Sequence, residues 1–573
     1  MNRRHVAKLA SILMVGAALL PAAAQTADSQ ASSTTKFASR TDLVLVPVIV
    51  HDKKGAHVPG LKAEDFAIFQ DGKQQKLASA EEVIASPPAT AAKPGQPGEF
   101  TNQGMTGPEA QRLTIIAFDT INTPFLNQTQ AREGLVRYLV KNLERGPVAL
   151  LKIYPGGVSL VFDFTTDREV IRAGLTQALK QNFHAMQDSR AIDHPRDIQK
   201  FNAGLPDDAP KAGPLDLTRV PDPTLKVKLL SDLAESWSSS TLQRNAIQET
   251  LEAMRHIASV YAGVPGRKSL LWLTAGFPWD VNPGSEATPG GVTWVYDLTF
   301  QQLNDANISV YPVNVKGIEI QGATLEDTAR NRGTSIADPT TFSAPKGDDE
   351  YQARISTLEV VASMTGGQAF YRDNELPLAF QKAEEDASGY YMLAYYLERE
   401  NTRPGWHKLQ VKTTRKGTNL RTRSGFFTTA AGTTAGPENS ELAAALNSPL
   451  DYTGLPVTVR WLPVTVKPGA SLREVGCEVV LPAGAVTVDA GKNNHMSMEF
   501  LAAARDPGGA VATQFSQQVT QDLKPEGLAE LQARGLTYHN VLQLPPGQYL
   551  VRFVVRDDLS GRIGSVLAPL KVE

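Results

Sequence analysis

The chain of 573 residues is 42% hydrophobic and 20% charged, and its 57 Lys and Arg against 60 Asp and Glu give a net charge of −3. This balance excludes the basic footprint of a nucleic-acid-binding protein, and the composition excludes a disordered polyelectrolyte, a collagen-like fibre and a multispan membrane protein. A single cysteine, Cys477, excludes internal disulfides and thiolate zinc clusters. At roughly 150 residues per domain, the length predicts about three or four domains.

The N-terminus has the pattern of an export signal. Arg3, Arg4 and Lys8 are basic, residues 9–20 form an apolar run too short to span a bilayer, and small alanines follow up to Ala24. We therefore predict a signal peptide over residues 1–24 and an exported protein, periplasmic or extracellular. No later apolar run has membrane-spanning length, so we expect no membrane span. The choice between general secretion and twin-arginine export stays open.

A small β module is predicted at residues 41–85. Apolar and polar residues alternate there, and Asp71-Gly72 is a hairpin signal. The segment is too short to fold robustly alone, so we expect it to pack on its neighbour. Residues 86–110, which are rich in Pro, Gly and Ala, are predicted to be a linker.

Residues 111–400 alternate short apolar runs with helical patterns, which is typical of a doubly wound α/β domain. The run SLLWLT at 269–274 shows no alternation, as expected of a strand buried on both faces. The predicted strands of this domain are 113–119, 148–154, 158–162, 269–274, 308–315 and 390–396.

The rest of the chain returns to strand patterns. Residues 401–428 are predicted to form a β hairpin that extends the preceding domain, and residues 429–454 a second linker. Residues 455–573 are predicted to form a C-terminal β-sandwich with one short helix near 525–534. The predicted fold class is therefore multidomain, with an α/β domain between a small N-terminal β module and a C-terminal β-sandwich.

Several segments resemble a known family. LTIIAFD, which ends at Asp119 and precedes TINTP, resembles the opening of a von Willebrand factor type A domain. PGRKSLLWLT and NDANISVYPVNV resemble its fourth and fifth strands, and LEVVASMTGGQAFY with SGYYMLAYYLE resembles its closing part. With VHDKKG, VPGLKAEDF and IFQDGKQQ before them and RTRSGFF after them, this order resembles the VWFA-related family named for Acidobacteria, over roughly residues 41–428.

The resemblance implies a cation site, but an altered one. Type A domains often hold a divalent cation through oxygen ligands from D-x-S-x-S, from a Thr on a second loop and from an Asp on a third. These positions correspond to Asp119, Thr123 and Thr241, whereas Ile121 and Ala275 stand where two of the five ligands are usual. The resemblance therefore implies at most weak binding of Mg²⁺ or Ca²⁺. No other cofactor is expected.

Two alternatives to a weak cation site at Asp119, Thr123 and Thr241 remain open. Asp119 can instead end its strand and accept hydrogen bonds from nearby loop amides. Asp163, Asp167 and Asp280 are further carboxylates that could complete an ion site from the rim, though the sequence does not place them.

Long loops offer a second kind of candidate site. Residues 183–240, 275–293 and 316–350 are expected to approach the carboxyl edge of a doubly wound sheet, where long loops are usually functional or disordered. Aromatic side chains on such a rim suit protein recognition. The candidate partner-binding residues are Asn122, Trp237, Phe277, Trp279, Asp280 and Trp294.

Enzyme signatures are absent from the sequence. There is no HExxH, no GxSxG and no Walker A motif, and the nine histidines have no metal-ligand spacing. We therefore expect an exported, non-enzymatic interaction or adhesion protein that binds a protein partner or an envelope component and no nucleic acid. The alternatives are a structural component of an envelope assembly and a hydrolase whose site is assembled from distant residues.

Overall fold

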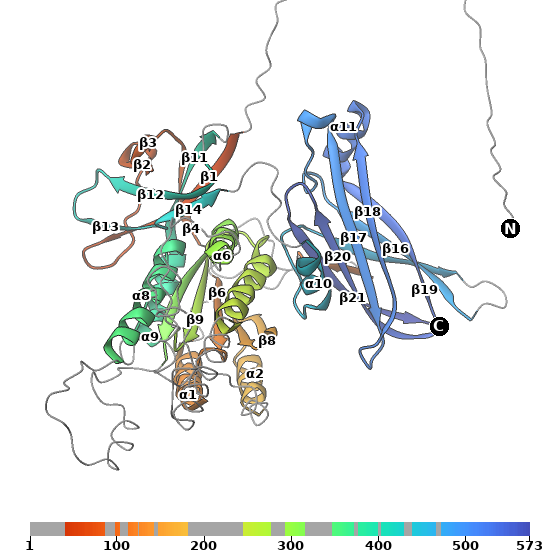
Figure 1. The fold of residues 1–573 in the computed structure, drawn as a ribbon, viewed down its shortest axis with the longest axis horizontal. Helices are drawn as coiled ribbons and strands as arrows, with labels where there is room; N and C mark the ends of the chain where they lie inside the picture. Colours follow the sequence, from red (N-terminus) through yellow and green to blue (C-terminus); the bar gives the residue numbers. More distant parts are fainter. Residues whose placement is uncertain are drawn as a thin grey trace, which may run out of the picture. The chain divides into compact units, whose positions relative to one another are not determined.

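The computed structural model describes residues 41–85, 98–103, 113–123, 125–142, 147–180, 245–276, 293–315, 347–371, 376–398, 403–428, 438–465 and 471–573. The signal peptide predicted at 1–24 lies outside these residues. The described strands form five sheets: one mixed sheet of parallel character and four antiparallel sheets (Figure 1). Among the described residues, no helix is both long enough and apolar enough to cross a membrane.

The mixed sheet is the centre of the α/β domain, which lies between residues 113 and 388. Its strand order is β10-β9-β6-β7-β8, with parallel pairing throughout except between β7 and β8. Every residue of β6 and β9 is buried, as the uninterrupted apolar runs predict. The strands are β6 (Leu113–Asp119), β7 (Val148–Tyr154), β8 (Gly157–Thr165), β9 (Lys268–Thr274) and β10 (Ile308–Asn314).

Helices cover both faces of this sheet. Ile115 and Ala117 of β6 pack with the helix over residues 245–261, α6 and α8, whereas Ile116 and Phe118 pack with α1, α2 and α9. This alternation divides the domain into two hydrophobic cores, one on each side of the sheet. The helices are α1 (Phe125–Asn142), α2 (Arg168–Lys180), α6 (Thr293–Asp305), α8 (Gly347–Thr365) and α9 (Leu376–Ser388). The doubly wound architecture predicted from the sequence is thus present.

The strand predicted at 390–396 exists but lies in another sheet. β11 (Gly389–Glu398) pairs antiparallel with β1 (Thr41–Asp52) on one side and with β4 (Leu77–Ile84) on the other. Alternate valines of β1, from Val44 to Val50, pack with Tyr391, Leu393 and Tyr395 of β11. The apolar run predicted a strand here, and in the structure this strand is covered by two antiparallel neighbours, β1 and β4, in place of a strand of the parallel sheet.

The segment predicted as a hairpin at 401–428 is instead shared between two sheets. β12 (Gly405–Thr413) pairs with β2 (Phe66–Gln70) and β14 (Gly425–Thr428), whereas β13 (Thr418–Arg421) pairs with β1. β3 (Lys73–Gln75) completes the second sheet through a turn at Asp71 and Gly72. Both turn residues have positive φ, 50° and 81°, as the predicted Asp-Gly hairpin requires.

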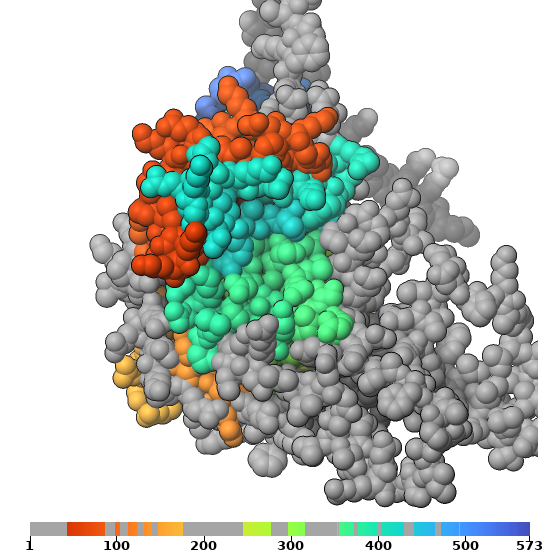
Figure 2. Space-filling model, turned by 90° about the vertical axis from the view of Figure 1, so that its left-hand side faces the viewer, coloured from red at the N-terminus to blue at the C-terminus, as the bar shows by residue number. Residues whose placement is uncertain are grey.

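The β module is therefore built from both flanks of the α/β domain. Residues 41–85 and 389–428 form its two four-stranded sheets, β13-β1-β11-β4 and β14-β12-β2-β3, around one apolar cluster. Figure 2 shows the two segments side by side, the first in red and orange and the second in teal. The α/β domain is inserted in sequence between these two halves, which explains why residues 41–85 alone looked too short to fold.

The predicted C-terminal β-sandwich is present and takes one strand from the first predicted linker. β5 (Glu99–Thr101) pairs with β15 of the sandwich, and Phe100 packs against its core. Asn102 is buried and its side chain bonds to Tyr452, Leu455 and Val457. Residues 98–103 are thus part of the C-terminal sandwich and not of a linker. A stretch as short as β5 can be a strand because the edge of β15 is open to pairing.

Two antiparallel sheets make up this C-terminal sandwich, β19-β16-β15-β5 and β18-β17-β20-β21. The predicted short helix is α11 (Pro525–Arg534), and the segment predicted as the second linker contains α10 (Glu438–Asn447). The remaining strands are β15 (Thr458–Thr465), β16 (Arg473–Leu481), β17 (His495–Arg505), β18 (Val511–Asp522), β19 (Leu536–Leu544), β20 (Gly547–Asp557) and β21 (Ile563–Val572), and two short 3-10 helices cover Ala63–Asp65 and Ala490–Lys492.

Candidate functional site

Asp119 lies at the carboxyl end of β6 and is fully buried. Its Oδ1 accepts hydrogen bonds from the backbone N–H groups of Ile121 (2.9 Å) and Asn122 (3.1 Å). Its Oδ2 accepts from the side chains of Asn122 (2.8 Å), Thr274 (2.8 Å) and Trp272 (3.2 Å). Both carboxylate oxygens are therefore engaged by the chain's own donors, which come from β9 and from the loop between β6 and α1.

Burial raises the pKa of Asp119 above its ordinary value, and the donors from Asn122, Thr274 and Ile121 oppose that rise because they favour the charged form. A buried carboxyl group with this many donors acts as a hub that fixes the loop. The arrangement matches the alternative in which Asp119 ends its strand and satisfies loop amides.

Thr123, the second predicted ligand, is also turned into the structure. Its Oγ1 accepts the backbone N–H of Ala275 at 3.1 Å, and its carbonyl oxygen accepts from the side chain of Gln128 at 2.7 Å. The first of these bonds ties the loop after β6 to the loop after β9. Thr241, the third predicted ligand, lies outside the described residues.

Thr250, on the helix over residues 245–261, also lies beside the loop that follows Asp119. Its Oγ1 accepts a hydrogen bond from Asn122 at 2.8 Å and donates to the carbonyl oxygen of Ala246. The sequence did not reveal Trp272 and Thr274 as partners of Asp119, or Thr250 as a partner of Asn122. Thr250 and Trp272 sit within apolar patterns that indicate only burial, so no sequence signal distinguished them.

The residues at this edge do not fit the cation that the resemblance implies. Ile121 is apolar and buried, Ala275 offers no carboxylate, and the oxygens of Asp119 and Thr123 face donors of the chain. Asp163 and Asp167 are exposed and accept hydrogen bonds from the backbone N–H groups of Phe164 and Glu169, and Asp280 lies outside the described residues. Across the described part of the chain, no group of three or more His, Cys, Asp or Glu side chains could hold a metal ion.

Most of the predicted rim cannot be placed. The side chain of Asn122 is used in the contacts with Asp119 and Thr250 described above. Trp237, Phe277, Trp279 and Asp280 lie outside the described residues, and Trp294 lies at the start of α6 with a side chain that is likewise outside them. The role of this rim in partner binding therefore stays a prediction.

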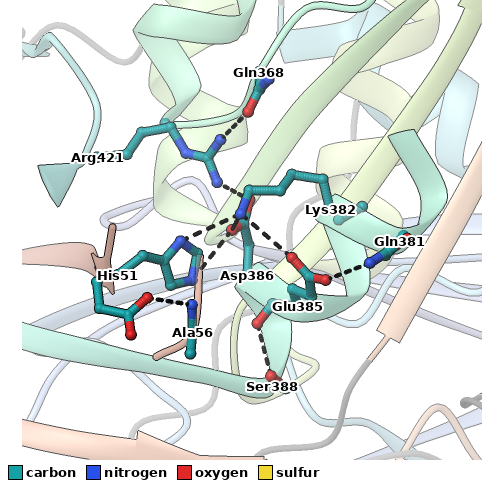
Figure 3. A network of polar contacts seen from close by, with 12 residues as sticks. His51, Ala56, Gln368, Gln381, Lys382, Glu385, Asp386, Ser388 and Arg421 are labelled. Carbon is teal, nitrogen blue, oxygen red and sulfur yellow. Dashed lines mark hydrogen bonds and ion pairs between the residues drawn. The ribbon is translucent and has the colours of Figure 1, made fainter. Parts of the chain in front are cut away.

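A second polar constellation lies where the β module contacts the α/β domain (Figure 3). Asp386 of α9 is fully buried, forms a close ion pair with Arg421 of β13, and accepts a hydrogen bond from the hydroxyl of Tyr311 at 2.7 Å. Lys382 of α9 and His51 of β1 approach it at 3.9 and 3.8 Å. The network thus joins side chains from two domains around one buried carboxylate.

His51 is held neutral in this network. Burial, and then the nearby cations Lys382 and Arg421, lower the pKa of His51 to about 4. Its Nδ1 lies 3.3 Å from Nζ of Lys382, which can only donate, so Nδ1 is the acceptor. Arg267, which is buried, extends the network by donating to the hydroxyl of Tyr311 at 3.0 Å.

A cleft of about 280 Å³ lies between the helix over residues 245–261, the turn between β7 and β8, and α10. Its lining includes Glu249, Glu252 and Glu441 together with His256 and Tyr452. Burial lowers the pKa of His256 to about 4, so this histidine is neutral near pH 7.

One Ser–His hydrogen bond beside this cleft bears on the hydrolase alternative. Nε2 of His256 lies 3.1 Å from Oγ of Ser448, but that hydroxyl already donates to the carbonyl of Leu450 and accepts its N–H. Nδ1 of His256 faces the hydroxyl of Tyr452 at 3.4 Å, where a catalytic triad would place a carboxylate. Ser448 is buried, so the contact joins α10 and its following turn to the α/β domain and presents no exposed nucleophile.

Comparisons with known proteins add little to what the structure itself shows. No family model matches the sequence, and no curated protein matches it. Among solved structures, the manganese-loaded TRAP protein of Plasmodium vivax is similar at 8% identity and a TM-score of 0.19, over 77% of this chain and 96% of that chain. The pilus adhesin SpaC of Lactobacillus rhamnosus GG, in its open conformation, is similar at 7% identity and a TM-score of 0.26, over 89% of this chain and 56% of that chain.

A β-glucuronidase of Bacteroides uniformis is also similar, at 10% identity and a TM-score of 0.14, over 32% of this chain and 19% of that chain. Scores this low carry no argument about what this chain binds or catalyses. The described sheets themselves show a mixed α/β protein with additional antiparallel sheets, and its place in the type A family stays a prediction.

Proposed function

We propose that this chain is an exported, non-enzymatic binding protein whose α/β domain contacts a protein partner or envelope component through the loops at its carboxyl edge, with no bound ion. The observation that supports ion-free binding is the hydrogen bonding of Asp119, whose two carboxylate oxygens accept five bonds from the chain. An ion that bridged this domain to an acidic partner would need such oxygens free.

Two further arguments support the location of the binding surface. The strand order β10-β9-β6-β7-β8 and the motifs quoted from the sequence favour a type A domain. In open α/β sheets, ligands bind outside the carboxyl ends of the strands, and the segments 275–293 and 316–350, predicted to be long loops, come directly after β9 and β10 in the sequence. The export signal predicted at residues 1–24 would place the protein in the periplasm or outside the cell.

The binding proposal is tested with residues 25–573 immobilised and exposed to solubilised envelope proteins of the organism that exports it. Captured proteins should be the same in Mg²⁺ and in chelator, because no ion takes part. A double variant, Phe277→Ala with Trp279→Ala, should lose them, since aromatic anchors carry much of the binding energy at interfaces. The matched control is Tyr396→Ala, which removes a side chain that is 61% exposed on the β module.

Each rival class predicts a different pattern. Loss of capture in chelator alone would show an ion-bridged contact, and equal loss in the Tyr396→Ala control would place the surface elsewhere. A structural component of an envelope assembly would tolerate the double substitution, and a hydrolase would turn over a substrate in an esterase, peptidase or glycosidase screen.

A further inference from the structure

The C-terminal sandwich has a long strand at the edge of one sheet. β18 spans twelve residues, Val511–Asp522, and pairs along nearly its whole length with β17. In the order β18-β17-β20-β21, its other side pairs with no strand among the residues that the structure describes. A strand edge of this kind presents a row of backbone N–H and C=O groups to whatever can pair with them.

Other edges of the same sandwich carry the usual protection. β5 has only three residues, and β21 contains Pro569 and Lys571. On β19, the backbone N–H of Val541 is taken by the side chain of Asn540 at 2.7 Å. β18 has none of these features: its sequence, VATQFSQQVTQD, holds no proline, no lysine and a single charge, Asp522, at its last position.

The open edge is held in place by its own side chains. Phe515 and Val519 pack against the core of the sandwich, and Gln517 accepts a hydrogen bond from the hydroxyl of Tyr538 at 2.7 Å. Gln518 donates to Asp558 at 3.1 Å. Because the strand is already ordered, pairing with a second strand costs little further conformational entropy.

We propose that β18 pairs antiparallel with β18 of a second copy of this chain, so that the two four-stranded sheets become one continuous sheet in a symmetric dimer. In such a pair the twofold axis stands perpendicular to the sheet and passes beside one residue, which faces its own copy. The middle of β18 places that residue at Ser516 or Gln517.

Charge and side-chain chemistry favour this occupant over a charged peptide. Self-pairing about the middle of the strand sets Asp522 of each copy opposite the uncharged start of the other β18, so no like charges face each other. The side chains that meet near the axis are Ser, Gln and Thr, which can hydrogen-bond across the pair. This proposal does not depend on what the α/β domain binds.

Introduced cysteines test the geometry directly. The chain's own cysteine, Cys477, is fully buried, and burial raises the pKa of its thiol to about 11, so it does not react under mild oxidation. Facing residues of antiparallel strands have Cβ atoms about 4.5–5.5 Å apart, close enough for a disulfide after slight adjustment. We expect either Ser516→Cys or Gln517→Cys of residues 25–573 to form a disulfide-linked dimer, and the control Gln548→Cys, on the interior strand β20, to form none.

The dimer itself is measured by sedimentation of the unmodified chain over a range of concentrations. A dimer is expected, and Ser516→Lys should raise its dissociation constant at least tenfold because two lysines then meet near the axis. Gln548→Lys adds the same charge on an exposed position away from the edge and should change nothing. A chain that stays monomeric, or a dimer that Ser516→Lys leaves intact, overturns the proposal; a monomer whose partner capture is weakened by Ser516→Lys assigns the edge to a strand of another protein.

Discussion

Replacing Asp386 by alanine should lower the free energy of unfolding by about 3–5 kcal/mol, because it leaves the partly buried cations of Arg421 and Lys382 without their buried counter-charge. Arg421, Lys382 and Arg267 all lie around Asp386 or its partner Tyr311, and Asp386 is fully buried. Removing one charge from such a network destabilises the protein by more than the whole network stabilises it. The reason is that the remaining charges are left largely shielded from water without a partner. Denaturant unfolding of residues 25–573 followed by circular dichroism measures the change.

The helix that carries Asp386 also supplies the control. Glu385 is its sequence neighbour and pairs with Lys382 at 3.3 Å, but its side chain is 40% exposed, so Glu385→Ala should cost at most about 1 kcal/mol. The double variant Asp386→Ala with Arg421→Ala should lose clearly less than the sum of the two single variants. Additive losses, or equal losses for Glu385→Ala and Asp386→Ala, would show that the network does not join the two domains energetically.

Asp119→Ala should be similarly destabilising, by about 3–5 kcal/mol, and for a different reason. The substitution leaves the donors of Trp272, Thr274 and Asn122 buried without an acceptor at the carboxyl end of β6. Asp119→Asn keeps the shape and one acceptor but turns an amide group toward those donors, so its cost should be intermediate, about 1–3 kcal/mol. Thermal and denaturant unfolding of both variants give the ranking.

The control for Asp119 is an exposed aspartate of the same domain. Asp163 is exposed and accepts the N–H of the next residue, and Asp163→Ala should change the free energy of unfolding by less than about 0.5 kcal/mol. If Asp119→Ala behaved like Asp163→Ala, Asp119 would not be the hub of the loop, and its carboxylate would again be a candidate ligand.

The sequence predicted the strands of the α/β domain well and their partners less well. Uninterrupted apolar runs identify β6 and β9 as strands buried on both faces, and the structure places them at the centre of the sheet. The apolar run of β11 indicates a strand but does not say which sheet it joins, and its partners β1 and β4 lie more than 300 residues earlier in the chain. Register between such distant segments depends on packing that local patterns do not encode.

The sequence also failed to predict two short elements that lie in segments predicted to be linkers. β5 has three residues within a stretch rich in Pro and Gly, and α10 lies within a segment predicted as a linker. Their burial comes from the domains they touch: Phe100 packs on the sandwich core, and Leu442 and Ala445 pack with the α/β domain. Propensity cannot reveal an element whose stability is supplied by tertiary contacts.

At the candidate site, too, the sequence revealed some of the residues and missed others. The motif comparison identified Asp119 and Thr123 and the loss of ligands at Ile121 and Ala275. It did not identify the donors that take the place of an ion, because Thr250 and Trp272 reach Asp119 or its neighbour Asn122 only through the fold. Polar residues within apolar patterns are therefore where the sequence is least informative about function here.

The central claim, that this edge works without an ion, is tested most directly by calorimetric titration of residues 25–573 with Mg²⁺, Ca²⁺ and Mn²⁺. We predict no saturable heat and no rise in Tm with any of the three, because the oxygens of Asp119 and Thr123 are bonded to the chain itself. Saturable binding that raises Tm and disappears in Asp119→Asn would contradict this account and restore an ion-bridged mechanism.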